Sequence, residues 1–441
     1  MDAAAAMRRV HAAALGYQPM RMKPVHFATS FLLAVTGRHS TLELLNKASV
    51  PKAAPKSRIG EIDEYVAEAL LPRLRSEGRM GPGVSEPAFK ALRAHLNAAF
   101  NNDGAALGPA FAPYRPFGSD YSSPSTAYLT DMSKNHGFSG SFVARVFSAT
   151  PAGRELLDGV RSVLSLPAPP MEALGAPLLD AAEQDWVDPY DERFGSLDAD
   201  RAAALGELME DQTRALSRLV SNLMQARSSY ALRYMVLGLA SWLFSYMMRR
   251  GGGRPLLLLD CLEGRNRRVR AQSRASYSRQ LDAFARSYDV SHAAGGLTVD
   301  EDDWLAFSRS GEARQSLEDH FRDLGVRIGF IQPRAPGARR KHCELQGDTL
   351  KVLALTVLGE GEILTVIEFS RRLRETWGVL AGADPEDGEL LREGGFWPLD
   401  ADDDLEPNGA AFRRLLVRLG LAVEPSDGLT LCALDAEELI G

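Results

Sequence analysis

The sequence predicts a mainly α-helical protein: a large helical N-terminal domain and a C-terminal domain in which helices precede a β-hairpin. Two patterns indicate this class. Apolar residues recur at helical spacing along much of the chain, and two short apolar runs flank an Asp-Gly turn near its end. The 441 residues are 45% hydrophobic and 25% charged, which excludes a wholly disordered, collagenous or disulfide-framework chain.

The N-terminal domain is expected to span residues 1–250. Helical patterns run from Glu61 to Arg75, from Pro151 to Leu164 with Thr150 as N-cap, and from Ala202 to about Met224. The apolar segment Tyr234 to Met248 is bounded by arginines and is shorter than the roughly 20 residues of a membrane span. It therefore predicts a buried helix, packed antiparallel to its predecessor.

Residues 251–324 are expected to form an arginine-rich segment that packs on the helical domain. Three glycines at 251–253 mark a flexible break, and Pro255 to Asp260 (PLLLLD) is typical of a short buried strand. An amphipathic helix is expected from Val269 onward.

The third domain is expected over residues 325–441. A short strand is expected at Val326 to Ile331. The predicted helices lie at Asp348–Leu358, Leu364–Trp377 and Asn408–Leu419. Two runs, Leu421–Val423 and Leu429–Leu431, predict a hairpin around the intervening Asp-Gly turn.

This order of helices and hairpin resembles a winged-helix domain over about the last fifth of the chain. In that family the helix before the hairpin usually enters the DNA major groove. The resemblance implies that Arg413, Arg414 and Arg418, at outward-leaning positions of Asn408–Leu419, contact phosphates or guanine. The general architecture is similar to accessory subunits of bacterial DNA-maintenance and anti-phage systems, in which a winged helix is appended to a helical body.

Charge is distributed unevenly. Residues 325–441 carry 13 basic and 21 acidic side chains, a net charge of −8, whereas the preceding residues carry +1. Between Gly264 and Gln280 there is no acid. The six basic residues there, called the arginine stripe below, are Arg265, Arg267, Arg268, Arg270, Arg274 and Arg279.

Two interpretations of each charged region stay open. The arginine stripe suits phosphate oxygens, or it is a solvated helix face that pairs with the acidic C-terminal domain. The C-terminal domain reads DNA or docks a protein, because its acids, among them Asp400 and Asp402, would repel phosphates or cap the following helix.

No sequence motif indicates a catalytic residue, a cofactor site or a metal site. The sequence contains no P-loop, no G-x-S-x-G elbow, and no C-x-x-C or H-E-x-x-H spacing. Asp260 and Glu263 loosely resemble a nuclease core but are only three residues apart. Three distant cysteines and the lack of a secretory signal pattern favour a reducing cytoplasm.

We therefore expect a non-catalytic bacterial accessory protein that binds nucleic acid, with DNA favoured, or docks a nucleic-acid enzyme within a multi-protein complex. Its expected partners are nucleic acid and protein subunits, with no membrane association and with homo-oligomer formation left open. A winged-helix transcriptional regulator and a metal-dependent nuclease using Asp260 and Glu263 are the alternatives.

Overall fold

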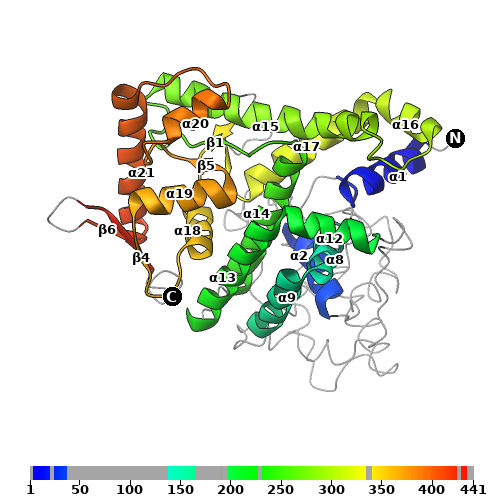
Figure 1. The fold of residues 1–441 in the computed structure, drawn as a ribbon, viewed down its shortest axis with the longest axis horizontal. Coiled ribbons are helices and arrows are strands. Elements are labelled where there is room, and N and C mark those ends of the chain that lie inside the picture. Colours follow the sequence, from blue (N-terminus) through cyan, green and yellow to red (C-terminus); the bar gives the residue numbers. More distant parts are fainter. Residues whose placement is uncertain are drawn as a thin grey trace, which may run out of the picture.

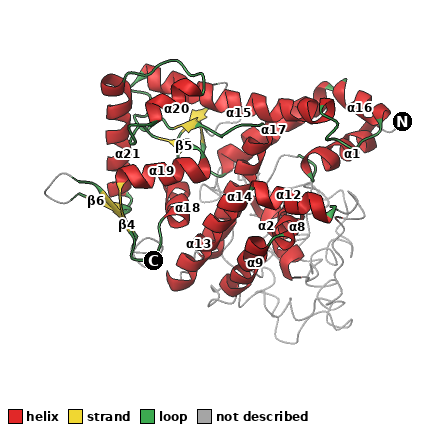
Figure 2. Cartoon of the chain, in the orientation of Figure 1, coloured by secondary structure: helices red, strands yellow, loops and turns green. Residues whose placement is uncertain are grey.

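The computed structural model describes residues 3–19, 24–36, 138–164, 190, 197–226, 231–333, 340–424 and 429–434. Helices dominate these residues and the strands are few and short, which confirms the mainly α class (Figure 2). The helix predicted at Glu61 to Arg75 lies outside the described residues.

The N-terminal body is helical. Its elements are α1 (Ala3–Leu15), α2 (Pro24–Thr36), α8 (Ser139–Ala149), α9 (Pro151–Leu164), α12 (Ala199–Leu208), α13 (Glu210–Ala226) and α14 (Ala231–Arg250). Helix α9 has the predicted bounds, and the hydroxyl of Thr150 accepts the Gly153 N–H at 3.2 Å as its cap.

The single helix predicted from Ala202 to Met224 is wrong, because the chain breaks at Met209 into α12 and α13. The Met209 N–H turns back to the Gly206 carbonyl, and the Met209 side chain enters the core. A tight turn that keeps the apolar residues on one side does not interrupt the sequence periodicity.

Helix α14 lies at the centre of the fold and contacts α13, α15, α17 and α18 (Figure 1). From Met235 to Met248 all of its side chains are buried, which confirms the predicted core helix. Among the described residues, no helix is long and apolar enough to cross a membrane.

Helix α15 (Arg267–Ala293) runs along the upper edge of Figure 1, from the C-terminal unit to α16 (Glu301–Ser308), beside which α1 packs. Helix α17 (Gly311–Arg327) follows. The strand predicted at Val326 to Ile331 is wrong over its first part, since α17 continues to Arg327 and β2 covers only Ile331–Gln332. The boundary expected between residues 324 and 325 therefore falls inside a helix.

The C-terminal unit contains short strands and five helical elements. The strands are β3 (His342–Cys343), β4 (Ile363–Thr365), β5 (Val379–Leu380), β6 (Ala422–Val423) and β7 (Leu431–Ala433). The helical elements are α18 (Gly347–Val357), α19 (Val366–Trp377), α20 (Asp387–Glu393), the π-helical turn η5 (Ala401–Leu405) and α21 (Glu406–Arg418).

Three small sheets connect these strands. Strands β4, β7 and β6 form an antiparallel sheet in that order, with Ala422 opposite Cys432 and Leu364 opposite the same cysteine. The predicted hairpin is thereby confirmed; residues 425–428 of its turn lie outside the described residues. Strand β2 pairs antiparallel with β3.

The predicted strand after Pro255 is also present, as β1 (Leu257–Leu258), and it pairs in parallel with β5 of the C-terminal unit. A small apolar cluster buries this junction; its members are Leu256, Leu258, Val269, Leu380, Leu391, Phe396 and Leu405. Because these residues come from the β1 segment, α15, β5 and the segment that leads to α21, the start of α15 is packed against the C-terminal unit.

Candidate nucleic-acid interface

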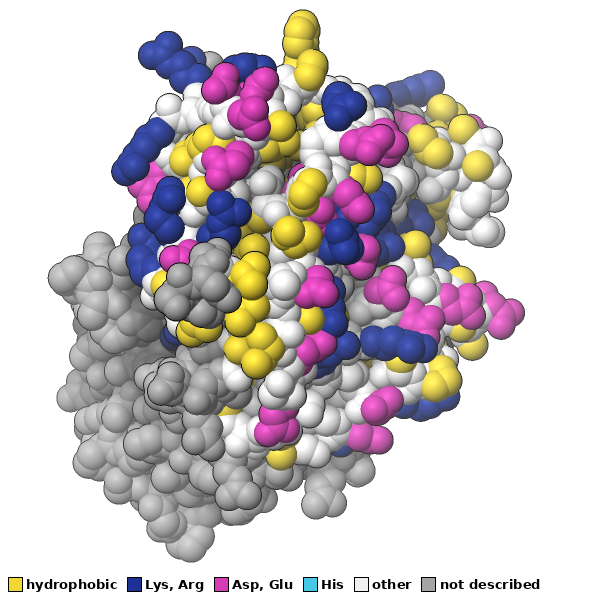
Figure 3. All heavy atoms as spheres, turned by 60° about the vertical axis from the view of Figure 1, so that its left-hand side comes forward, with side chains coloured by type: hydrophobic (Ala, Val, Ile, Leu, Met, Phe, Trp, Pro, Cys, Tyr) yellow, Lys and Arg dark blue, Asp and Glu magenta, His cyan; other side chains and the backbone are white. Residues whose placement is uncertain are grey.

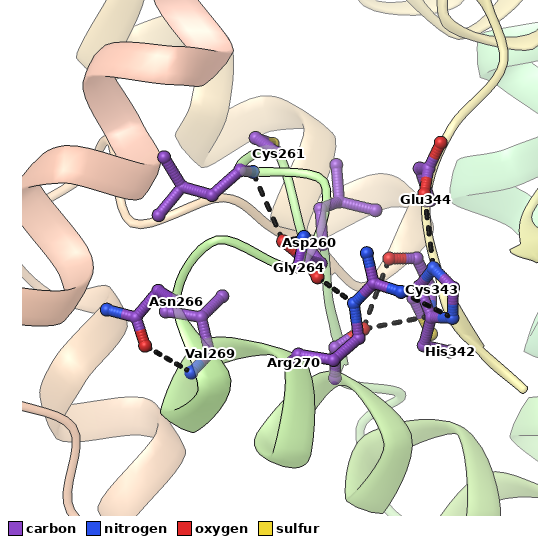
Figure 4. A network of polar contacts seen from close by, with 12 residues as sticks. Asp260, Cys261, Gly264, Asn266, Val269, Arg270, His342, Cys343 and Glu344 are labelled. Atoms are coloured by element: carbon purple, nitrogen blue, oxygen red, sulfur yellow. Dashed lines mark hydrogen bonds and ion pairs between the residues drawn. The ribbon is translucent and has the colours of Figure 1, made fainter. Parts of the chain in front are cut away.

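Asp260 closes the turn that leads from β1 to α15. It is fully buried, and its Oδ1 accepts the N–H groups of Leu262 at 3.1 Å and Gly264 at 3.3 Å. The Arg270 guanidinium donates from Nε to Oδ2 (Figure 4). Both oxygens thus have donors inside the protein, as a capping aspartate requires.

Glu263 does not join Asp260 in a carboxylate pair. It is exposed, with a left-handed φ of 55°, in the turn that Asp260 holds. No group of three or more His, Cys, Asp or Glu side chains among the described residues is arranged to hold a metal ion. The nuclease alternative requires both residues to meet further carboxylates, and the described residues contain no such group around them; the alternative stays a prediction.

Arg270 also approaches His342 on β3, with 3.5 Å between Nη1 and Nδ1. Because a guanidinium can only donate, Nδ1 must accept, which places the His342 proton on Nε2, 3.1 Å from Glu344 Oε2. The result is a polar chain from buried Asp260 to the partly exposed Glu344 (Figure 4).

Cys343 lies next to His342 in sequence but contacts α15. The Ser273 hydroxyl accepts the Cys343 N–H at 2.9 Å and donates to its carbonyl at 3.1 Å. Burial raises the pKa of the Cys343 thiol to about 12, so the thiol stays protonated at neutral pH. Through these two residues, β3 is therefore held against α15.

Arg268 and Asn266 join the start of α15 to η5. Asp404 of η5 is buried; its Oδ2 lies 3.2 Å from Arg268 Nε, and its Oδ1 accepts from Asn266 at 2.9 Å. Arg268 also donates to the Pro398 carbonyl at 3.3 Å. Nearby, the backbone N–H groups of Asp403 and Asp402 hold the pKa of Asp400 below its usual range, as expected for an N-cap.

Arg279, the last arginine of the stripe, contacts the loop after α20. Its guanidinium donates to the carbonyls of Gly394 and Gly395, the latter at 2.9 Å, and lies 4.0 Å from the centre of the Phe396 ring. Arg268, Arg270 and Arg279 are thus used in intramolecular contacts, and two of them neutralise carboxylates of this chain.

The rest of the stripe is less engaged. Arg265 and Arg267 are exposed, and no described residue forms an ion pair with either side chain. Arg274 is half-buried, and its Nε is enclosed without a described hydrogen-bond partner. The arginine stripe is therefore not a continuous free surface; its exposed part is the turn before α15 and the first turn of the helix.

Two of the three arginines of α21 are exposed as the sequence predicts. Phe412 and Leu416 are buried in the core, while Arg414 and Arg418 are exposed one turn apart, with no ion pair to a described residue. Arg413 is partly buried and lies 3.4 Å from Glu406.

Two residues of the interface region were not found by sequence reasoning. Asn408, at the start of α21, is fully buried. It donates to the carbonyls of Leu259 and Ala381 at 2.9 and 2.8 Å and accepts from Cys261 N–H at 3.0 Å. Trp397, in the loop after α20, is 79% exposed. An Asn at a helix start is typical of a surface cap, and a single Trp has no diagnostic spacing.

The surface around α21 carries both charge signs. Figure 3 shows basic and acidic side chains interspersed with exposed hydrophobic ones, with Lys and Arg densest along its upper left margin. This mixture is weaker in long-range attraction for a polyanion than a uniform basic face would be.

No protein-family model, curated protein or solved structure matches this chain. The resemblance to winged-helix domains therefore stays a prediction, which rests on the order of the elements from α18 to β7.

Proposed function

We propose that the chain is a non-catalytic, nucleic-acid-binding component of a larger assembly, in which α21 and the β6–β7 hairpin contact duplex DNA. The observation that carries this proposal is the pair Arg414 and Arg418, exposed on one face of the helix directly before the hairpin. Arginine serves both phosphate and guanine contacts.

The support of α21 favours this role. Its inner face is fixed by Phe412 and Leu416, and Asn408 ties its first turn to the β1–β5 junction. A helix held in this way presents its arginines in one orientation, which reduces the entropy lost on binding.

The acidic charge of the unit limits the strength of binding. Asp402, Asp403 and Glu406 are exposed at the end of α21 opposite Arg418. We therefore propose a contact restricted to the helix and hairpin, completed in the cell by another component of the assembly.

Duplex binding by the full chain, measured by fluorescence anisotropy over a salt series, tests the proposal. Replacing Arg414 and Arg418 by Ala should weaken affinity about tenfold and reduce the salt slope by about 0.9 for each lost phosphate contact. The matched control removes two exposed arginines elsewhere, Arg214 on α13 and Arg286 on α15. An identical slope in the α21 variant and the wild type would refute the interface.

Protein docking is a second candidate, favoured by the outer face of the β4–β7–β6 sheet. Ile363, Val423 and Leu429 are each more than half exposed, while Leu364 and Cys432 on the opposite face are buried. Exposed apolar residues in one small unit indicate a protein contact. Changing Ile363, which lies on β4 outside the helix and hairpin, to Ser should remove a partner cross-linked in the host cell without altering duplex binding.

A further inference from the structure

Trp397 is the most exposed of the large hydrophobic side chains in the described part of the chain. Three other tryptophans, Trp242, Trp304 and Trp377, are buried. Covering an exposed indole on binding is favourable, and Trp is enriched among the residues that carry most of the free energy of binding.

The exposure of Trp397 does not come from a loosely attached loop. On one side of it, Phe396 is buried beneath the Arg279 guanidinium, which also bonds to the carbonyls of Gly394 and Gly395. On the other side, the Pro398 carbonyl accepts from Arg268 at 3.3 Å. Both sequence neighbours of Trp397 are thus fixed to α15, so the backbone that carries the exposed indole is held in one position.

We infer that Trp397 and the arginines at the start of α15 form a binding site for an unpaired nucleotide of a single-stranded nucleic acid. This inference rests on the proposed nucleic-acid-binding function and deepens it. The indole offers a flat face on which a base stacks. Arg268 is paired with Asp404 and bonded to the Pro398 carbonyl beside the indole, but its side chain is 59% exposed and its Nη1 has no described partner, so this atom can donate to a phosphate. The exposed Arg267 precedes it on the helix that holds the loop.

The surroundings of Trp397 favour a nucleotide over an apolar protein partner. Between residues 381 and 407 it is the only exposed large hydrophobic, whereas a protein hot spot usually lies within a packed apolar patch. A base needs one stacking face and nearby donors, which is what this surface contains. A single strand is required because the base faces of a duplex are covered by their neighbours.

The nearby acids determine how this site depends on salt. Asp404 is buried and paired, but Glu393, Asp402 and Asp403 are exposed and repel phosphates. Stacking rather than charge therefore supplies most of the affinity, and the salt slope stays near that of one or two phosphate contacts, about 0.7 each.

Tryptophan fluorescence of the full chain, titrated with a short oligothymidylate, tests the site. Stacking should quench the emission of the exposed Trp397. Trp397→Leu should lose the quenching and bind the labelled oligonucleotide about tenfold more weakly by anisotropy, while Trp397→Phe should keep most of the affinity without the quenching. The control Val290→Ala, at an exposed apolar position near the far end of α15, should match the wild type.

Different results would refute the stacking site and the α21 interface. Oligothymidylate binding that is absent in the wild type, or as tight in Trp397→Leu as in the wild type, would overturn the stacking site. Unchanged duplex binding after replacement of Arg414 and Arg418 would instead refute the proposed function, whatever the response of Trp397.

Discussion

Arg268 of α15 and Asp404 of η5 form an ion pair, with 3.2 Å between Nε and Oδ2, that joins the basic start of α15 to the acidic C-terminal unit. The aspartate is buried and also accepts from Asn266 and from the Asp400 N–H. This contact therefore pairs a cation of the arginine stripe with an anion of the acidic C-terminal unit within the same chain.

A double-mutant cycle on this pair should give a coupling free energy of about 1 kcal/mol in urea unfolding, because the aspartate is buried while the arginine is solvent-screened. Arg268→Ala, Asp404→Ala and the double variant complete the cycle. The exposed pair Arg214 and Glu210, one turn apart on α13, is the control and should couple more weakly, because water screens both side chains. Equal coupling in the two pairs would contradict the role given to Asp404.

Arg270→Met should lower the free energy of unfolding by about 3 kcal/mol, because it leaves the fully buried Asp260 carboxylate without its cation. Arg267→Met, three positions earlier and exposed, should change it by less than about 0.5 kcal/mol. The two variants remove the same charge, so urea denaturation separates a structural arginine from a free one. Similar destabilisation in both would show that the Asp260 contact has no special weight.

Asn408→Ala should destabilise the protein by about 3 kcal/mol. The change removes three buried hydrogen bonds and leaves the carbonyls of Leu259 and Ala381 without this donor. The comparison is Asp300→Ala, which removes the exposed N-cap of α16 and should cost about 1 kcal/mol. Thermal unfolding of both variants shows which substitution destabilises the protein more. A smaller destabilisation by Asn408→Ala would show that water replaces the contacts of Asn408.

The features predicted correctly from sequence depend on neighbours in the chain. The cap at Thr150, the apolar length of α14 and the hairpin of β6 and β7 follow from residues within about one element of each other. The outward positions of Arg414 and Arg418 follow from the same helical periodicity.

The features missed depend on tertiary contacts. Asn408 bonds to Leu259, 149 positions away, and Arg268 meets Asp404 across more than a hundred residues. No local sequence pattern predicts such distant partners. The sequence therefore left open whether the arginine stripe contacts phosphates or groups of the same chain. The strand expected at Val326 failed because the apolar run VRIGFI suits the end of a helix as well as a strand.

His11 makes stability depend on pH below neutrality. It is buried between α1, α15 and α16, 3.1 Å from the Tyr288 hydroxyl and edge-on to Phe307. Burial, assisted by the charge of His320, lowers the pKa of His11 to about 3. The folded state therefore keeps this imidazole neutral at pH values where the unfolded chain, with a pKa near 6.5, takes up a proton.

This difference stabilises the fold above pH 6.5, and its contribution is lost as the pH falls from 6.5 toward 3. By linkage the His11 share of the loss is about 2 kcal/mol between pH 7.5 and pH 5. Urea unfolding at these two pH values gives the fall in the free energy of unfolding. This fall should be smaller in His11→Gln than in the wild type by that amount. Val290→Ala, at an exposed site near the end of α15, should keep the wild-type loss because it removes no titratable group and His11 is still present. Equal losses in wild type and His11→Gln would place the acid sensitivity elsewhere.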